Sequence, residues 1–338
     1  MKRSLSVILA LTLVLSVFLA SCGEKSTAKK EEAKEVTVYS PNQTEIINPI
    51  VKEFQDRTGI KVNLVTGGTG ELLKRIQAEK DNPLGDVIWG GGAESLEAYK
   101  DYFEPYKSTE DAAIDKTFKS ATNHWTGFTA LPMVILYNKS LVSEDKKPQG
   151  WADLSKPEWK GKIAYTDPAK SGSAYTQLIT MVAAMGGQTQ GWEFVNQFSN
   201  NLDGKIQESS SYAPKKTSDG EYALGLTLEE SAYRYVVGGS KVGIIYPKEG
   251  TSAVPDGVAI IKGAKHIGNA KKFLDFTVGK DVQNIVVKDF MRRSVRNDIA
   301  AAKGLPAMKE MKLVNYNFDD AAKNKDQYLA KWKGIFTK

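Results

Sequence analysis

Short β-rich runs alternate with segments of helical periodicity in the first third of this chain. Three runs rich in β-branched and aromatic residues each precede a segment whose apolar residues recur at helical spacing. The expected strands cover 36–39, 61–65 and 86–89, and the expected helices cover 46–58, 71–79 and 93–99. Gly59 stands where a helix that ends in a left-handed residue needs a glycine. This order predicts an α/β fold with a largely parallel sheet and helices on both faces.

A second series of strands and helices begins after the long apolar stretch 127–137, which contains Pro132. We interpret this stretch as a strand that crosses between two lobes. Further strands are expected at 162–165, 222–226, 242–246 and 258–261, and further helices at 171–184, 191–198, 229–237, 268–277, 281–288 and 321–332. Two lobes are expected because about 300 residues outgrow one core. We assign 36–133 plus 248–310 to lobe 1, 134–247 to lobe 2, and 311–338 to a C-terminal helix.

The N-terminus has the pattern of an export signal. Lys2 and Arg3 precede an uncharged run rich in Leu, Val and Ile, which is short for a membrane span of about 20 apolar residues. The run ends in small residues before Cys22, the only cysteine in the sequence, and so resembles a bacterial lipobox. We expect residues 1–21 to be removed, Cys22 to be lipidated and 22–35 to form a flexible tether. The alternative is an uncleaved anchor helix with an incidental cysteine.

Composition and motifs argue against several classes of function. The formal net charge is +6, but lysines are interspersed with acids and form no basic block, so we expect no nucleic-acid partner. His124 and His266 are far apart in sequence and belong to no metal or catalytic motif. No nucleophile elbow, phosphate-binding loop or dinucleotide fingerprint is present. We therefore expect no catalytic residues, no metal and no cofactor.

Small polar turns precede several of the expected helices. Their residues include Ser40, Thr69, Gly70, Gly91, Gly92, Ser171, Gly172 and Ser173. In a parallel sheet such turns fall at the carboxyl ends of strands, where open α/β folds bind ligands. Helix N-termini attract anions through unpaired N–H groups, and Ser and Thr add hydroxyl donors. Each turn taken alone also fits an ordinary helix cap.

These turns and their flanking residues carry a family resemblance. The chain resembles the extracellular solute-binding proteins of bacterial ABC importers, and within them the branch of ferric-iron, aminoethylphosphonate and sugar-phosphate binders. The matching segments are Val38-Tyr39-Ser40-Pro41, Gly68-Thr69-Gly70-Glu71-Leu72, Asp86-Val87-x-Trp89-Gly90-Gly91, Ser171-Gly172-Ser173-Ala174-Tyr175 and Gly225-Leu226-Thr227-x-Glu229. The resemblance covers residues 36–300. It implies two α/β lobes that are joined by hinge strands and close over a ligand, the fold of type II periplasmic binding proteins.

The resemblance leaves the ligand open. Iron-binding members typically use two adjacent tyrosines, whereas this sequence has Tyr233-Arg234-Tyr235, whose rings would point in different directions on a helix. The hydroxyl-rich turns instead suit a small anion, such as a phosphonate or a sugar phosphate. Glu229 could take an amine or hydroxyl of the ligand, or could only complement a helix dipole. Tyr175, Thr227 and Tyr246 complete the candidate ligand-binding residues.

The sequence therefore predicts capture without turnover. We expect a monomer that is exported and lipid-anchored through Cys22 to the cell envelope, facing the periplasm or the outer surface. Its expected partners are a small anionic solute and an ABC permease, which receives the solute from the closed form. Ferric iron is the alternative ligand. A secreted enzyme on the same fold is the alternative from a different class.

Overall fold

The computed structural model describes residues 33–337, so the predicted signal peptide and the predicted lipidation site at Cys22 lie outside the described residues. Lys34–Lys338 forms one compact unit, built around a sheet of ten strands. The main path of the sheet runs β2 (Lys61–Thr66), β1 (Glu35–Ser40), β3 (Val87–Gly92), β9 (Ala253–Ile261), β5 (Thr126–Asn138), β7 (Leu224–Leu228), β6 (Ile163–Ala164). Off this path, β4 (Phe103–Glu104) pairs with β9, whereas β8 (Val242–Ile245) and β10 (Arg293–Ser294) pair with β5.

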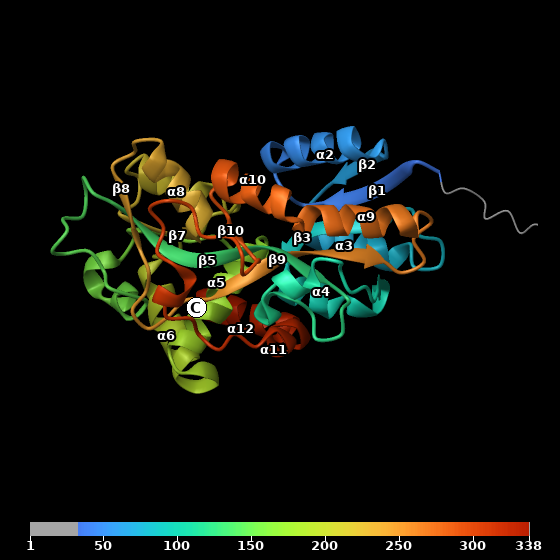
Figure 1. Cartoon of the computed structure of the whole chain (residues 1–338). Coiled ribbons are helices and arrows are strands. Elements are labelled where there is room, and N and C mark those ends of the chain that lie inside the picture. Colours follow the sequence, from blue (N-terminus) through green and yellow to red (C-terminus); the bar gives the residue numbers. More distant parts are fainter. Residues whose placement is uncertain (1–32, 338) are drawn as a thin grey trace, which may run out of the picture. The chain divides into compact units, whose positions relative to one another are not determined.

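Strand β5 links two groups of strands (Figure 1). Its first part, Thr126–Pro132, pairs with β9, and its second part, Met133–Asn138, pairs with β7 and β8. The change of partner falls next to Pro132, which has no N–H to donate to a ladder. The expected crossing strand over 127–137 is thus confirmed. We call β1, β2, β3, β4 and β9 with their helices the first half, and β6, β7 and β8 with their helices the second half.

Parallel pairing is confined to β1 with β2 and β3, and to β6 with β7. Both β5 and β9 run antiparallel to every strand with which they pair. We expected a more extensive parallel sheet, because the early strands each precede a helix. Strand β9 differs because it follows β8 with no crossover helix between them, so it enters the first half in the opposite direction.

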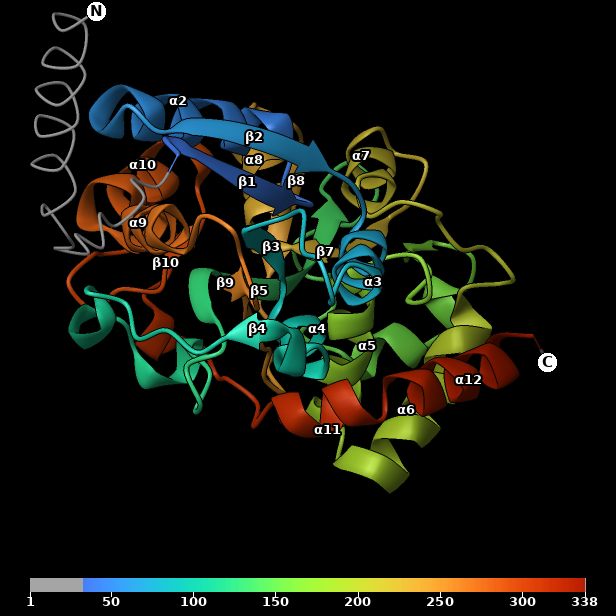
Figure 2. The same cartoon turned by 90° about the vertical axis from the view of Figure 1, so that its right-hand side faces the viewer.

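Helices cover both faces of the first half (Figure 2). One face carries α2 (Thr44–Thr58), α9 (Ile267–Val278) and α10 (Lys280–Phe290), and the other carries α3 (Thr69–Ala78) and α4 (Ala93–Ala98). Val87 and Trp89 of β3 join the core under α2, whereas Ile88 joins the core under α3, as the pleat of a strand requires. Trp89 makes edge-on contacts with Phe128 and Phe273, at centroid distances of 5.2 and 5.6 Å. All five helices were expected from the sequence.

The second half has a core of its own, in which Tyr165 packs edge-on against Phe198 and Trp332. Its helices are α5 (Gly172–Ala184), α6 (Gly187–Asn201), α7 (Tyr212–Ser218) and α8 (Glu229–Val237). We did not expect α7, which is short and contains Pro214. Proline is tolerated there because it falls in the first helical turn, before any N–H has a partner within the helix. No helix of residues 33–337 is both long and apolar enough to cross a membrane.

The C-terminal segment forms two helices where one was expected. Helix α11 (Phe318–Lys323) packs against α4, and α12 (Lys325–Phe336) packs against α6. The break falls at Asn324, whose amide donates to the Asp320 carboxylate at 2.8 Å. Such a local side-chain bond favours a helix end over a helix interior. The segment therefore touches both halves of the fold.

Candidate functional site

A cavity of about 330 Å³ lies between the two halves, and we call it the cleft. The first half and β5 contribute Pro41, Asn42, Gly68, Thr69, Gly91, Gly92, Leu131, Met133, Val254, Asp256 and Arg292. The second half contributes Lys170, Ser171, Gly172, Ser173, Thr176, Glu208, Ser209, Ser210 and Leu228. Most of these residues are small or carry hydroxyl or amide groups, so the cleft offers many hydrogen-bond donors. Its volume is at the small end of the range for ligand sites.

The first half offers the start of helix α3 to the cleft. Thr69 opens this helix and Gly68 precedes it as the N-cap. The irregular end of β3 is pressed against Thr69, because a Cβ added at Gly91 would lie 2.8 Å from the Thr69 methyl carbon. Gly91 also has a φ of +91°, which a residue with a side chain rarely adopts. Glycine at this position therefore keeps backbone N–H groups accessible beside the positive end of the α3 dipole.

The second half offers the start of helix α5. Ser171 is its N-cap, and the Ser171 hydroxyl accepts the N–H of Ala174 at 3.3 Å. The hydroxyls of Ser171 and Ser173 lie 3.0 Å apart. A Cβ at Gly172 would meet nothing within 4 Å, so this first turn is open. Because the first N–H groups of a helix have no partner within it, the cleft lies between two ready anion-binding termini.

An ion pair lies among the charged groups of the cleft. Arg292 donates from Nη1 to Asp256 at 2.9 Å, and both side chains are buried. Asp256 also accepts the N–H of Thr129 at 2.9 Å. Burial raises the pKa of Asp256, and the guanidinium opposes that rise. The Nε of Arg292 is buried without a hydrogen-bond partner among the described residues, so the guanidinium has donor capacity that Asp256 does not use.

A second ion pair lies at the exposed rim of the cleft. The Lys170 ammonium contacts Glu208 at 3.0 Å, and both side chains are more than half exposed, at 53% and 78%. An exposed pair of this kind contributes little stability. Lys170 directly precedes the α5 N-cap, so its ammonium can move to an anion at this helix terminus at small cost.

A buried carboxylate joins the two halves beside the cleft. Glu94 of α4 accepts the hydroxyl proton of Thr176 of α5, and Thr176 lines the cleft. The other carboxylate oxygen of Glu94 has no hydrogen-bond partner among the described residues. Burial raises the pKa of Glu94, because the charged form has lost its water without a matching cation in contact.

Comparison with known proteins places the chain in a family. A family model described as bacterial extracellular solute-binding protein matches residues 83–324. The chain belongs to this family. Iron uptake protein A1 from Synechocystis sp. is 29% identical to this solute-binding protein over 328 residues, covering 91% of this chain and 90% of that one. A putative 2-aminoethylphosphonate-binding periplasmic protein of Salmonella typhimurium is 21% identical over 298 residues, covering 83% and 85%.

Solved structures agree on the fold of this solute-binding protein. The periplasmic binding protein AfuA from Actinobacillus pleuropneumoniae, with fructose-6-phosphate bound, has a TM-score of 0.82 and 24% identity. The superposition covers 90% of this chain and 98% of the AfuA chain. The expected two-lobe α/β fold of periplasmic binding proteins is thus confirmed, and so is membership of a family that binds solutes outside the cell.

Six of the predicted ligand-binding residues of this solute-binding protein line the cleft. They are Thr69, Gly91, Gly92, Ser171, Gly172 and Ser173. Gly70 lines an adjoining hollow of about 500 Å³, which Thr69 and Ser171 also border. Ser40 is fully buried, and its hydroxyl donates to the carbonyl of Trp89 in β3 at 2.6 Å.

The remaining four predicted residues are not among those that line the cleft. The Glu229 carboxylate accepts hydrogen bonds from the Arg293 guanidinium at 2.7 and 2.8 Å and from the Tyr246 hydroxyl at 2.5 Å. The Glu229 side chain is 1% exposed. Tyr175 is fully buried, and its hydroxyl donates to the Ala321 carbonyl. Thr227 is buried in β7, opposite Val134 of β5. Glu229 stands in the first turn of α8, as the dipole alternative expected, and its carboxylate also forms a buried ion pair.

Several cleft residues were not predicted. Asp256 and Arg292 are 36 positions apart and belong to no local motif, so only the fold brings them together. Lys170 and Thr176 flank the predicted Ser171-Gly172-Ser173 turn, and helical spacing could have indicated them. Ser209 and Ser210 belong to a run of three serines, a visible signal because such a run is rich in donors.

The tyrosines of the 233–235 segment do not meet in the cleft. Tyr233 donates to the Lys303 carbonyl at 2.7 Å, and Tyr235 lines a separate hollow with Arg234 and Gln43. The residues that line the cleft include no Tyr and no His. Among the described residues, no group of three or more His, Cys, Asp and Glu side chains is placed to hold a metal ion.

Proposed function

We propose that this solute-binding protein captures a small phosphorylated or phosphonate solute in the cleft. The observation that carries the proposal is the convergence of two helix N-termini, at Thr69 and Ser171, on one cavity that Arg292 also lines. Each terminus offers N–H groups and a partial positive charge, and Arg292 adds a guanidinium. The solute would bridge the two halves and stabilise the closed form through its higher affinity for that form.

Residues 36–133 plus 248–310 and residues 134–247 are our proposed moving lobes. Support comes from β5, which changes partner at Pro132, near the proposed boundary. The segment 311–338 packs on both lobes and would follow their motion. The closed form would then deliver its solute to an ABC permease without chemical turnover, and the protein would act as a monomer.

Lipidation at Cys22 would hold the protein at the cell envelope, facing the periplasm or the outer surface. We expect Cys22→Ala to remain exported but to leave the detergent phase in a detergent-partition assay, because it has no acyl chains. Retention of the variant in the detergent phase would show that another segment supplies the anchor.

Thermal unfolding with candidate solutes tests the ligand class. A solute that binds only the folded state raises the melting temperature. We expect a shift with fructose 6-phosphate or 2-aminoethylphosphonate, and a loss of that shift in Thr69→Val/Ser171→Ala. The matched control, Thr109→Val/Ser218→Ala, changes the same residue types away from the cleft and should keep the shift. No shift with any phosphorylated or phosphonate solute would refute the proposed ligand class.

Ferric iron remains a second candidate because a relative that is 29% identical is named as an iron uptake protein. Iron would need oxygen donors other than tyrosine from the cleft, namely Asp256, Glu208 or a co-bound anion. A thermal shift with ferric citrate that is absent with citrate alone, together with no response to phosphorylated solutes, would favour iron.

A further inference from the structure

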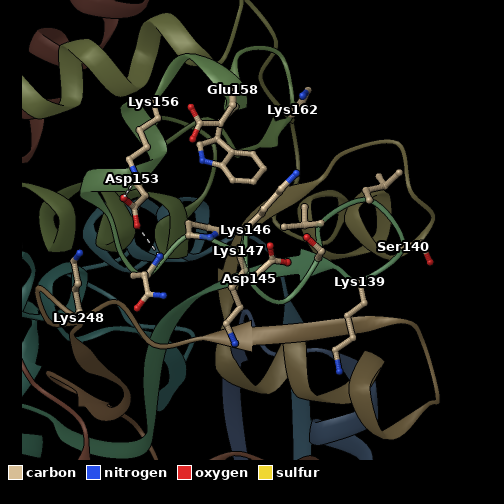
Figure 3. A pocket seen from close by; sticks show the side chains of 16 residues that line it. Lys139, Ser140, Asp145, Lys146, Lys147, Asp153, Lys156, Glu158, Lys162 and Lys248 are labelled. Carbon is tan, nitrogen blue, oxygen red and sulfur yellow. Dashed lines mark hydrogen bonds and ion pairs between the residues drawn. The ribbon is translucent and has the colours of Figure 1, made fainter.

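A second hollow, outside the cleft, lies on the second half of the protein (Figure 3). It encloses about 870 Å³ between the segment 139–149, which follows β5, and the segment 153–162, which leads into β6. None of its lining residues lines the cleft. We call it the lysine hollow, because its lining includes Lys139, Lys146, Lys147, Lys156, Lys162 and Lys248.

Cations outnumber anions in this hollow. The lining holds six lysines but only three acids, Asp145, Asp153 and Glu158. Lys156 pairs with Asp153 at 2.7 Å, and Lys147 pairs with Glu144. The other four lysines are at positions 139, 146, 162 and 248. Their ammonium groups form no ion pair or hydrogen bond within residues 33–337. The hollow therefore gathers like charges whose mutual repulsion a bound anion would relieve.

Two of the three acids of the hollow, Asp145 and Asp153, already have partners. Asp153 accepts the Gln149 N–H at 2.7 Å in addition to its contact with Lys156. Although burial opposes the change, these two contacts and the nearby Lys248 charge lower the pKa of Asp153. A hydrogen bond from Ser143 likewise lowers the pKa of Asp145. Among the described residues, Glu158 is the one lining acid without an ion pair or hydrogen bond, so the free ammonium groups still outnumber the free carboxylates.

The wall of the hollow is partly apolar. Val142 and Trp159 are buried in the lining at 4% and 7% exposure, whereas Leu141 is 55% exposed beside the lysines. Ammonium groups around an exposed apolar side chain suit a ligand that carries charged phosphates next to less polar groups. Lysine binds phosphate as a mobile point charge, so a set of lysines accommodates clustered phosphates without fixed geometry.

We propose that the lysine hollow binds clustered phosphate groups, either of a soluble oligophosphate or of the headgroups of an anionic membrane. The site is separate from solute capture, and a ligand there can be bound with the cleft empty or filled. Each lysine near such a phosphate cluster strengthens binding by about fivefold.

Lys146→Gln/Lys162→Gln tests the proposal. Both side chains are exposed, and neither ammonium group forms an ion pair or hydrogen bond with the residues that the structure describes, so the double variant should fold normally. The control Lys61→Gln/Lys272→Gln removes the same charge from exposed lysines of the first half. Tripolyphosphate is titrated by calorimetry into the full chain, and cosedimentation is measured with phosphatidylglycerol-containing and pure phosphatidylcholine vesicles. All variants share the same N-terminal segment, which contributes equally to their vesicle binding. The variants are therefore compared by the part of vesicle binding that added salt removes, because salt screens contacts between lysines and headgroups.

We expect binding of tripolyphosphate or of the phosphatidylglycerol vesicles to weaken about tenfold or more in the hollow variant and to stay near wild type in the control. The probe that shows this pattern identifies the source of the phosphates. Equal weakening in the two double variants, or no salt-sensitive binding of either probe to the wild type, overturns the proposal. Fructose 6-phosphate binding in the cleft is measured in parallel, and its failure would bear only on the proposed solute.

Discussion

Glu229 and Arg293 form a buried, two-contact ion pair whose side chains are 1% and 3% exposed. Removing one charge leaves the other buried without compensation. We expect Glu229→Gln to lower the free energy of unfolding by about 3–5 kcal/mol, measured by urea denaturation. Asp56→Asn, which breaks the exposed Lys52–Asp56 pair, should have little measurable effect.

The same variant separates a structural role for Glu229 from a role in ligand contact. A structural role predicts lower stability in Glu229→Gln, with solute affinity kept in the fraction that stays folded. If the variant instead unfolds like wild type and loses solute affinity, Glu229 contacts the ligand, and the buried pair is not the native arrangement.

Glu94 gives stability a pH dependence of known sign. Burial raises its pKa, so between the unfolded-state pKa and the higher folded-state pKa the folded protein holds a proton that the unfolded chain releases. The contribution of Glu94 to stability therefore falls as pH rises through that window. Gln mimics the protonated side chain. We expect Glu94→Gln to have the same melting temperature as wild type at about pH 4 and a higher melting temperature at about pH 7.

Thermal melting of both proteins over this pH range checks the sign. Glu221→Gln, at an exposed position, is the control and should track wild type throughout. A Glu94→Gln protein that is less stable than wild type at neutral pH would mean that a cation such as Lys325 compensates the charge, contrary to our prediction.

At the scale of elements, the irregular end of β3 depends on Gly91. Ala at this position would hold a φ of +91° and bring its Cβ to 2.8 Å from Thr69 of α3. We expect Gly91→Ala to cost about 1–3 kcal/mol of stability and to weaken solute binding, because the end of β3 and the α3 terminus must separate. Urea denaturation and calorimetry measure the two effects.

Gly334 provides the matched control, because it lies within α12 and an added Cβ would meet nothing within 4 Å. Gly334→Ala should raise stability by about 0.5–1 kcal/mol and leave solute binding unchanged. Wild-type stability and affinity in Gly91→Ala would show that the end of β3 tolerates the shift and does not shape the cleft.

At the scale of the whole molecule, a side-chain hydrogen bond joins the two halves, in addition to the bond between Glu94 and Thr176. Arg234 of α8 donates from both terminal nitrogens to the Gln43 side-chain carbonyl, at 3.3 Å each, and Gln43 precedes α2. We expect Gln43→Ala to weaken solute binding by about two- to tenfold, because the closed form loses a charged hydrogen bond. Small-angle scattering should show a larger radius of gyration without solute and an unchanged one at saturation.

Gln190→Ala, on the exposed surface of α6, should change neither quantity. If Gln43→Ala binds solute as tightly as wild type and has the same radius of gyration without solute, the contact between Arg234 and Gln43 is not part of closure.

The sequence by itself determined most elements of this protein, and six of the twelve predicted ligand-binding residues line the cleft. Periodicity located the helices, because one face of each must be apolar, and Gly59, with its φ of +67°, ended α2 as expected. Polar turns before α3 and α5 indicated Thr69 and Ser171, because donors near a helix start are a local property of the chain.

The tertiary structure alone decided which distant side chains meet. Asp256 of β9 pairs with Arg292, which follows α10, and Glu229 pairs with Arg293. A buried charge is costly unless an opposite charge compensates it, and only the fold brings these partners together. The direction of β9 and the gathering of six lysines in one hollow also follow from packing. Local sequence carries propensity and period, whereas charge pairing and strand direction depend on neighbours that only the folded chain supplies.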